Sequence, residues 1–314
     1  MNYIQQAYKG EIGFWKYLII PIGFTGLMVL NYLAIKLLNL DVNEIMRQEI
    51  ERKGEIRVLI ETLMPLAIGL VLLLLWVKFI HKQSLTSLTT ARKKIDWKRI
   101  FFAFFLWGIL SSSMVLLQYF STPEDFVYNF KLKPFVYLAI VSILLIPLQT
   151  SFEEYLFRGY LIQGIGAFFK NSWLPLFFTS IVFGLMHLGN PEVGELGPVI
   201  MTYYIGTGFF LGIITLMDDG LELALGFHAA NNLFTALLVT TDWTAFQTPS
   251  ILRNTAEPTE ISMLEVIVPV FVIFPILIFI FSKIYKWNNW KEKLFGRVEP
   301  PFDEESKVNM IGES

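Results

Sequence analysis

The sequence contains no cysteine among its 314 residues. This absence excludes disulfide bonds, a thiolate nucleophile, cysteine-ligated zinc and lipid attachment through cysteine. It carries no information about the cellular compartment. Histidine is also scarce, with only His81, His187 and His228.

Charged residues are equally sparse. They make up 17% of the chain, whereas soluble globular domains carry roughly 25%. Hydrophobic residues reach 54%, and the mean hydropathy is +0.54. The formal net charge is −2, which argues against nucleic acid as a partner because phosphate binding needs an excess of lysine and arginine. The composition therefore indicates an integral membrane protein.

Long apolar runs recur along the chain, and a membrane helix needs about 20 such residues. We expect an all-α polytopic membrane protein with about eight transmembrane helices. The predicted spans are 17–38, 58–80, 100–121, 134–157, 173–189, 198–217, 221–240 and 263–282. We divide the chain into N-terminal helices (1–130), a motif-bearing part (131–242) and a C-terminal part (243–314) made of a loop, the last helix and a tail.

The distribution of lysine and arginine predicts the orientation, because cytoplasmic loops are enriched in both. Six basic residues lie in 81–99, and six follow Ser282. We therefore expect both segments and both chain ends on the cytoplasmic side of a cell inner or plasma membrane. Segment 39–57 is expected outside, although four basic residues accompany its five acids. Its apolar residues have helical spacing, which predicts a helix on the membrane surface.

Three polar motifs interrupt the apolar runs, and the first is EEYLFR, residues 153–158. Neighbouring helix residues differ by about 100°, so Glu153 and Glu154 cannot share one face. Glu154 stands four residues before Arg158, the favourable order for an ion pair. Glu153 shares its side with Gln149, and an unpaired, partly desolvated carboxylate is a good general base. The alternative is a helix end at the headgroups with all three charges solvated.

The second and third motifs each carry a histidine in an apolar run. In FGLMH, Phe183 and His187 are four residues apart, and in HAANN the same spacing joins His228 to Asn232. Either pair alone is typical of packing or of hydrogen bonds between membrane helices. Together with Glu153 they form a hydrolytic set, in which a carboxylate activates water, one histidine holds that water or a metal, and histidine plus asparagine donate to an oxyanion.

The three motifs, in this order, resemble those of the CAAX prenyl protease and bacteriocin-processing (CPBP, or Abi) family of intramembrane proteases. The family patterns EExxxR, FxxxH and HxxxN are matched at 153–158, 183–187 and 228–232. The resemblance covers about 134–240. It implies eight helices around an intramembrane cavity, and it implies hydrolysis of a peptide bond in a membrane-associated substrate.

The resemblance also implies a role for each motif residue. Glu153 activates water together with His187, His228 and Asn232 stabilise the oxyanion, and Glu154 with Arg158 supports the site. Members are described as metalloproteases or as metal-free glutamate proteases. The cofactor therefore stays open: Glu153, His187 and His228 are the ligands if zinc is used, and the metal-free form is favoured on the resemblance alone.

Other functions remain open at this point. A transporter with a proton relay also places ionisable groups at membrane depth, and a non-catalytic scaffold or bacteriocin-immunity protein would keep the motifs without peptidase activity. The sequence leaves the substrate, its prenylation and the oligomeric state undetermined. From the eight-helix topology we expect the site to open toward the cytoplasm.

Overall fold

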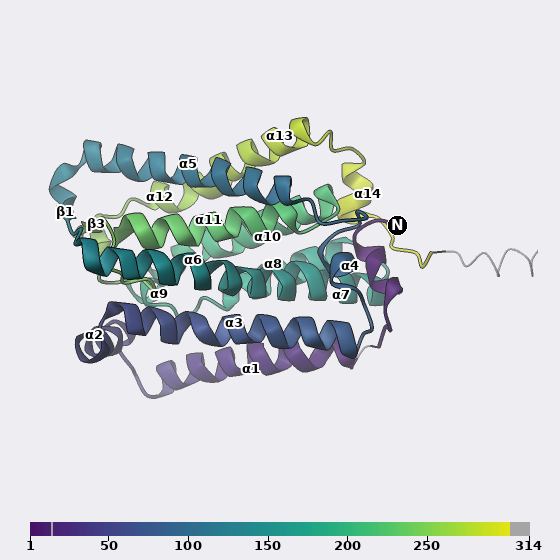
Figure 1. The fold of residues 1–314 in the computed structure, drawn as a ribbon, viewed down its shortest axis with the longest axis horizontal. Coiled ribbons are helices and arrows are strands. Elements are labelled where there is room, and N and C mark those ends of the chain that lie inside the picture. The colour runs from purple at the N-terminus through teal and green to yellow at the C-terminus, as the bar shows by residue number, and fades with distance from the viewer. Residues whose placement is uncertain (14, 302–314) are drawn as a thin grey trace, which may run out of the picture.

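The chain is described by a computed structural model that covers residues 1–13 and 15–301. The helices lie side by side in an elongated bundle (Figure 1). The α-helices are α1 (Lys16–Leu37), α2 (Val42–Lys53), α3 (Glu55–Phe79), α4 (Leu85–Thr89), α5 (Trp97–Ser121), α6 (Leu132–Glu154), α7 (Ile162–Phe169), α8 (Trp173–Leu185), α9 (Pro191–Leu196), α10 (Ile200–Asp218), α11 (Glu222–Leu238), α12 (Met263–Val268), α13 (Phe274–Ile284) and α14 (Trp290–Phe295). Residues 302–314 of the expected cytoplasmic tail lie outside the described part of the chain.

Short irregular elements complete the fold. Two π-helical segments join α6 to α7 (Tyr155–Leu161) and α12 to α13 (Pro269–Ile273), and 3₁₀ turns occupy Ile4–Lys9, Pro123–Asp125, Gly197–Val199 and Pro258–Glu260. Three short strands form one small sheet: β1 (Phe126–Tyr128), β2 (Val239–Thr240) and β3 (Leu252–Asn254). The strand order is β1-β3-β2; β3 pairs antiparallel with β1 and parallel with β2.

The all-α polytopic membrane fold is confirmed. Within the described residues, six helical stretches are long and apolar enough to cross a membrane. They are Lys16–Leu37, Glu55–Phe79, Trp97–Ser121, Leu132–Phe169, Pro191–Asp218 and Met263–Ile284. The other two predicted runs form the shorter helices α8, with 13 residues, and α11, with 17. The count of eight crossings therefore stays a prediction.

The fourth predicted span, 134–157, ends too early. Helical structure continues from Leu132 through the π-helical segment into α7 and ends at Phe169. The left-handed conformation of Lys170 (φ 54°) terminates it. Residues Glu153 and Glu154 consequently lie inside a 38-residue stretch instead of near its end, so the solvated helix end considered above does not apply.

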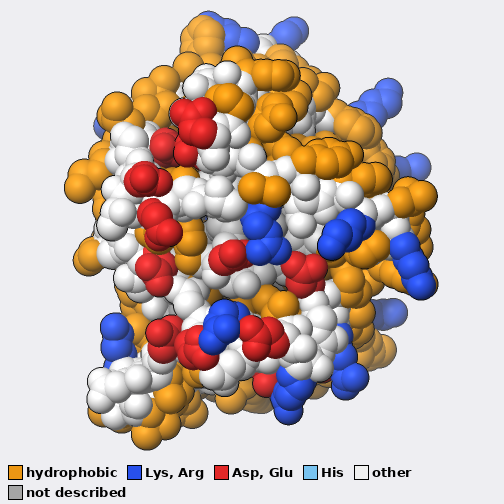
Figure 2. Space-filling view, turned by 90° about the vertical axis from the view of Figure 1, so that its left-hand side faces the viewer, with side chains coloured by type: hydrophobic (Ala, Val, Ile, Leu, Met, Phe, Trp, Pro, Cys, Tyr) orange, Lys and Arg blue, Asp and Glu red, His pale blue; other side chains and the backbone are white. Residues whose placement is uncertain are grey.

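The two ends of the bundle differ in their contents (Figure 1). One end, which we call the basic end, holds α4, α14 and the lysine- and arginine-rich segments 81–99 and 283–297. The other, which we call the sheet end, holds α2, α9 and the three strands. Figure 2 shows ionised side chains gathered on the sheet end, with apolar side chains around them. The predicted surface helix is present as α2 and lies at this end.

Helix α11 is the central element, since most of its residues are buried. It packs mainly against α5 and α6. Gly226 makes the contact with α5 possible, because a Cβ there would lie 2.0 Å from the carbonyl oxygen of Ile100. The third motif therefore stands at the centre of the bundle.

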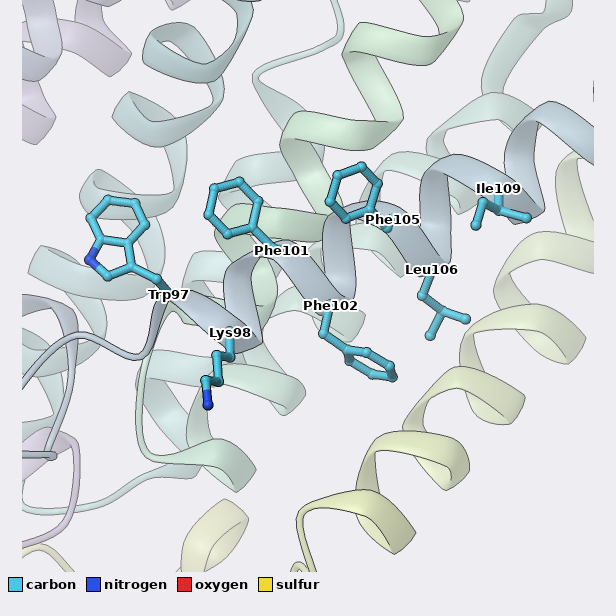
Figure 3. Close-up of a pocket in the computed structure, with 7 residues that line it drawn as sticks. All are labelled: Trp97, Lys98, Phe101, Phe102, Phe105, Leu106 and Ile109. Atoms are coloured by element: carbon cyan, nitrogen blue, oxygen red, sulfur yellow. The ribbon is translucent and has the colours of Figure 1, made fainter.

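The outer surface of the bundle is apolar, as a lipid-facing surface requires. A hollow on α5 illustrates this, with Trp97, Phe101 and Phe105 on one side and Phe102 and Leu106 on the other (Figure 3). Trp97, Phe101 and Phe105 are all more than half exposed. The hollow holds none of the motif residues, and we assign it to lipid contact.

Candidate active site

The structure brings the three motifs together inside the bundle. Glu153 stands on α6, His228 and Asn232 stand on α11, and His187 lies in the turn that follows α8. The Glu153 and His228 side chains are 13% and 7% exposed. The ionisable groups of the predicted site therefore lie in a largely dehydrated interior.

Glu153 is held by one of its two carboxylate oxygens. The Gln149 amide donates to Oε1 at 2.5 Å. Oε2 is buried and has no hydrogen-bond partner, and it lies 3.7 Å from Nε2 of His228. That separation is too long for a direct hydrogen bond, so Oε2 is a buried acceptor that is free to take a proton.

Glu154 forms the predicted ion pair with Arg158, and it also binds His228. Its Oε1 accepts from Nη1 of Arg158 at 3.1 Å and from Nδ1 of His228 at 2.8 Å. Both Glu154 and Arg158 are fully buried. Because the acceptor is a carboxylate oxygen, Nδ1 of His228 carries the proton, and Nε2 is the nitrogen that faces Glu153.

Arg158 connects the first motif to two further helices. Its Nη2 donates to the carbonyl oxygen of Gly208 on α10 at 3.2 Å. Its guanidinium lies over the ring of Phe183, the first residue of the second motif, with 4.0 Å between Cζ and the ring centroid. This is the geometry of a cation–π contact. Phe183 thus contacts the arginine through its ring and His187 through its backbone carbonyl.

His187 is fixed by its backbone neighbour and by a tyrosine. Its Nδ1 lies 2.9 Å from the carbonyl oxygen of Phe183, which is an acceptor, so Nδ1 is the protonated nitrogen. The ring stacks on Tyr204 with 4.2 Å between centroids and an angle of 18°. Nε2 of the neutral ring is consequently a hydrogen-bond acceptor.

Asn232 is linked to Glu153 by hydrogen bonds through Gln149. Its Nδ2 donates to Oε1 of Gln149 at 3.2 Å, and the same glutamine holds Glu153. Asn231 donates to Oδ1 of Asn232 at 3.1 Å, and Trp107 donates in turn to Asn231. Asn231 is not among the predicted site residues, so its support of Asn232 was not predicted.

The expected zinc ligands do not form a zinc site in this arrangement. Catalytic zinc takes three protein ligands, yet among the described residues no three His, Asp or Glu side chains converge on one point. Glu153 and His228 approach each other, and His187 keeps Nε2 free because its Nδ1 donates to a backbone carbonyl, but the three groups do not meet at one point. We therefore derive no step through a metal.

Access to the site differs between the two ends of the bundle. Toward the basic end, α4 is inserted among the helices: Ser87, Leu88 and Thr89 are at most 3% exposed. Toward the sheet end, the face of α11 opens, since His228 is buried, Asn232 is partly exposed and Thr235 is exposed.

Exposure along this face of α11 therefore increases toward the sheet end. With the predicted orientation this end is the outer side, so access from it would not agree with the expected cytoplasmic opening, and the side on which the site opens stays a prediction. Segment 81–99 is only partly a surface connection, because Ser87, Leu88 and Thr89 are buried in α4.

Comparisons with known proteins agree with the three motifs. A family profile described as type II CAAX prenyl endopeptidase Rce1-like matches residues 132–234, a range that contains every motif. Among curated proteins, the uncharacterized protein YyaK of Bacillus subtilis (strain 168) is 31% identical over 254 residues, which are 76% of this chain and 83% of that protein. No solved structure matches the chain. With its helical membrane fold, the chain thus belongs to the Rce1-like family of CAAX endopeptidases.

Proposed function

We propose that the protein is an intramembrane endopeptidase that hydrolyses a peptide bond of a membrane-associated substrate. One observation carries the proposal: Oε2 of Glu153 is buried, lacks a hydrogen-bond partner and faces Nε2 of His228 across 3.7 Å. An unpartnered polar atom in a protein interior is costly. It persists where a substrate, here water, completes the hydrogen bonding.

In this mechanism Glu153 acts as general base. Oε2 takes a proton from water, and the hydroxide oxygen attacks the carbonyl carbon of the scissile bond. The carbonyl oxygen becomes an oxyanion. When the tetrahedral intermediate collapses, the carbon–nitrogen bond breaks and the proton on Glu153 passes to the departing nitrogen. One water is consumed, and a carboxylic acid and an amine are formed, which at neutral pH become a carboxylate and an ammonium group.

The remaining motif residues supply orientation and charge. Nε2 of His187 accepts a hydrogen of the water, because its Nδ1 carries the ring proton. Asn232 donates to the oxyanion through Nδ2. His228 donates there only as an imidazolium, because its Nδ1 proton is already given to Glu154. The Glu154 carboxylate stabilises that positive charge.

The deciding experiment uses purified protein in detergent with two peptides, one ending in a farnesylated CAAX sequence and one identical but unmodified. We expect the wild-type protein to release a peptide fragment from at least one of them, and Glu153→Gln to lower the rate roughly 10²–10⁴-fold, the usual contribution of a general base. No release by the wild type, or equal release by Glu153→Gln, would favour the transporter or scaffold alternative.

The metal-free form of this mechanism makes a separate prediction. Because no three ligands converge, we expect full peptide release after treatment with a strong chelator and removal of metal by gel filtration. Loss of activity that added zinc restores would contradict this prediction, and would require Glu153, His187 and His228 to move closer together around the metal.

A further inference from the structure

A half-buried carboxylate outside the three motifs lies beside the site. Glu192, on α9, accepts a short hydrogen bond from the Tyr204 hydroxyl, and its Oε1 also accepts from Nδ2 of Asn190 at 3.2 Å. Its Oε2 accepts from the backbone N–H of Ala245 at 3.1 Å. Both carboxylate oxygens are thereby engaged, so Glu192 fixes the position of the tyrosine hydroxyl.

Tyr204 is the residue that stacks on His187. The rings are nearly parallel, at 18°, with centroids 4.2 Å apart. His187 needs this support because α8 ends at Leu185 and the histidine itself lies in a turn. Its imidazole interacts electrostatically with two carboxylates, those of Glu153 and Glu192.

We propose that Tyr204 and Glu192 are positioning residues for His187. The Tyr204 ring fixes the plane of the His187 imidazole by stacking on it, and Glu192 fixes the position of Tyr204 by accepting a hydrogen bond from its hydroxyl. This inference rests on the proposed function, since it assigns these residues to the same hydrolytic reaction.

Three variants separate the parts of this arrangement. Tyr204→Phe keeps the stacked ring and loses the hydroxyl; Glu192→Gln keeps an acceptor and loses the charge; Tyr204→Leu loses the ring. Tyr160→Phe is a matched control, because its hydroxyl is buried and bonds a different histidine, His81, at 2.9 Å.

Peptide release by these variants gives the first test. We expect kcat to fall about 100-fold in Tyr204→Leu, as misplacement of a group by about 1 Å does, and about 10-fold in Glu192→Gln and in Tyr204→Phe, with little change in KM. The double variant Tyr204→Phe/Glu192→Gln should lose no more kcat than either single variant, because the tyrosine hydroxyl and the carboxylate act as a unit. A kcat in Tyr204→Leu equal to that of Tyr160→Phe would overturn the proposal.

The second test does not depend on activity. The chain has only three histidines, so ¹⁵N-labelled imidazole signals can be assigned to His187 by comparison with His187→Asn. We expect Tyr204→Leu and Glu192→Gln to shift the His187 signals and leave those of His81 unchanged. Unchanged His187 signals in both variants would overturn the positioning role. If the wild type releases no peptide while these signals shift, the proposed function fails and the positioning geometry stands.

Discussion

At the scale of single residues, one oxygen atom of Glu154 supports both the arginine of the first motif and the histidine of the third. Oε1 of Glu154 receives both Arg158 and Nδ1 of His228. Helical spacing predicts the first contact because the two residues are four apart on one helix. The second joins residues 74 positions apart, and no periodicity reveals it. Glu154 is therefore more than a structural partner of the arginine.

Substitutions of Glu153 and of Glu154 should affect stability and peptide release differently: one should change activity alone and the other both. We expect Glu154→Ala and Arg158→Ala to lower the stability by about 3–5 kcal/mol, since each leaves a buried charge unpaired. Glu154→Ala should also abolish peptide release, because His228 loses its anchor. Glu153→Gln should be inactive with a nearly unchanged melting temperature, measured in the same detergent. A Glu153→Gln variant as unstable as Glu154→Ala would show that these roles are wrongly assigned.

At the scale of elements, the site depends on a close approach of α8 and α10. A Cβ on Gly208 would lie 2.5 Å from the backbone carbonyl oxygen of Ser180, and a backbone atom cannot move aside as a flexible side chain can. Gly208 also provides the carbonyl that accepts from Arg158. The spacing between these helices therefore positions both Phe183, on α8, and the arginine it covers.

The variant Gly208→Ala should push the two helices apart. Overpacking of this kind typically costs about 1–3 kcal/mol, and we expect peptide release to fall with it. Gly23→Ala on α1 is the matched control, because nothing lies within 4 Å of the added methyl group; it should be neutral or slightly stabilising. Melting temperatures and release rates of both variants check this prediction, and equal behaviour of the two would refute it.

Most elements could be predicted from apolar runs, and the exceptions have physical reasons. The run 134–157 was ended at the charged motif because charges usually mark a membrane boundary, yet inside the bundle the Glu154 carboxylate pairs with both Arg158 and His228. Helix α4 has only five residues and no amphipathic period. It is buried by hydrogen bonds to distant residues, such as Thr89 with Tyr155 at 2.8 Å and Leu88 with Tyr3 at 2.7 Å.

The site itself was predictable as a set of motif residues but not as a network. Gln149 was placed on the side of Glu153 by helical spacing, and this contact is present. Its simultaneous bond to Asn232 crosses from α6 to α11. Tyr204 and Glu192 lie outside the three motifs and could not be predicted. A tyrosine on an apolar helix is typical of ordinary packing, so nothing in the sequence marks it as part of the site.

At the scale of the whole molecule, the two ends of the bundle differ in how much they cover the site. The basic end is closed by α4 and by ion pairs that include Arg92 with Glu222 at 2.7 Å and Lys293 with Asp219 at 2.6 Å. The sheet end leaves Thr235 exposed on the same α11 face that carries His228 and Asn232. Substrate should therefore reach Glu153 from the sheet end.

Single cysteines test this direction, because the native chain has none to interfere. We place one at Thr235, one at Glu51, which is exposed on α2 at the sheet end, and one at Lys94, which is exposed at the basic end. A membrane-impermeant thiol reagent is applied to intact cells and to permeabilised cells. We expect Thr235→Cys to label under the same condition as Glu51→Cys, whichever side of the membrane that end faces, because both share one aqueous compartment. Labelling of Thr235→Cys together with Lys94→Cys instead would mean that the route to Glu153 runs past α4, and the buried residues 87–90 would then have to move to admit the substrate.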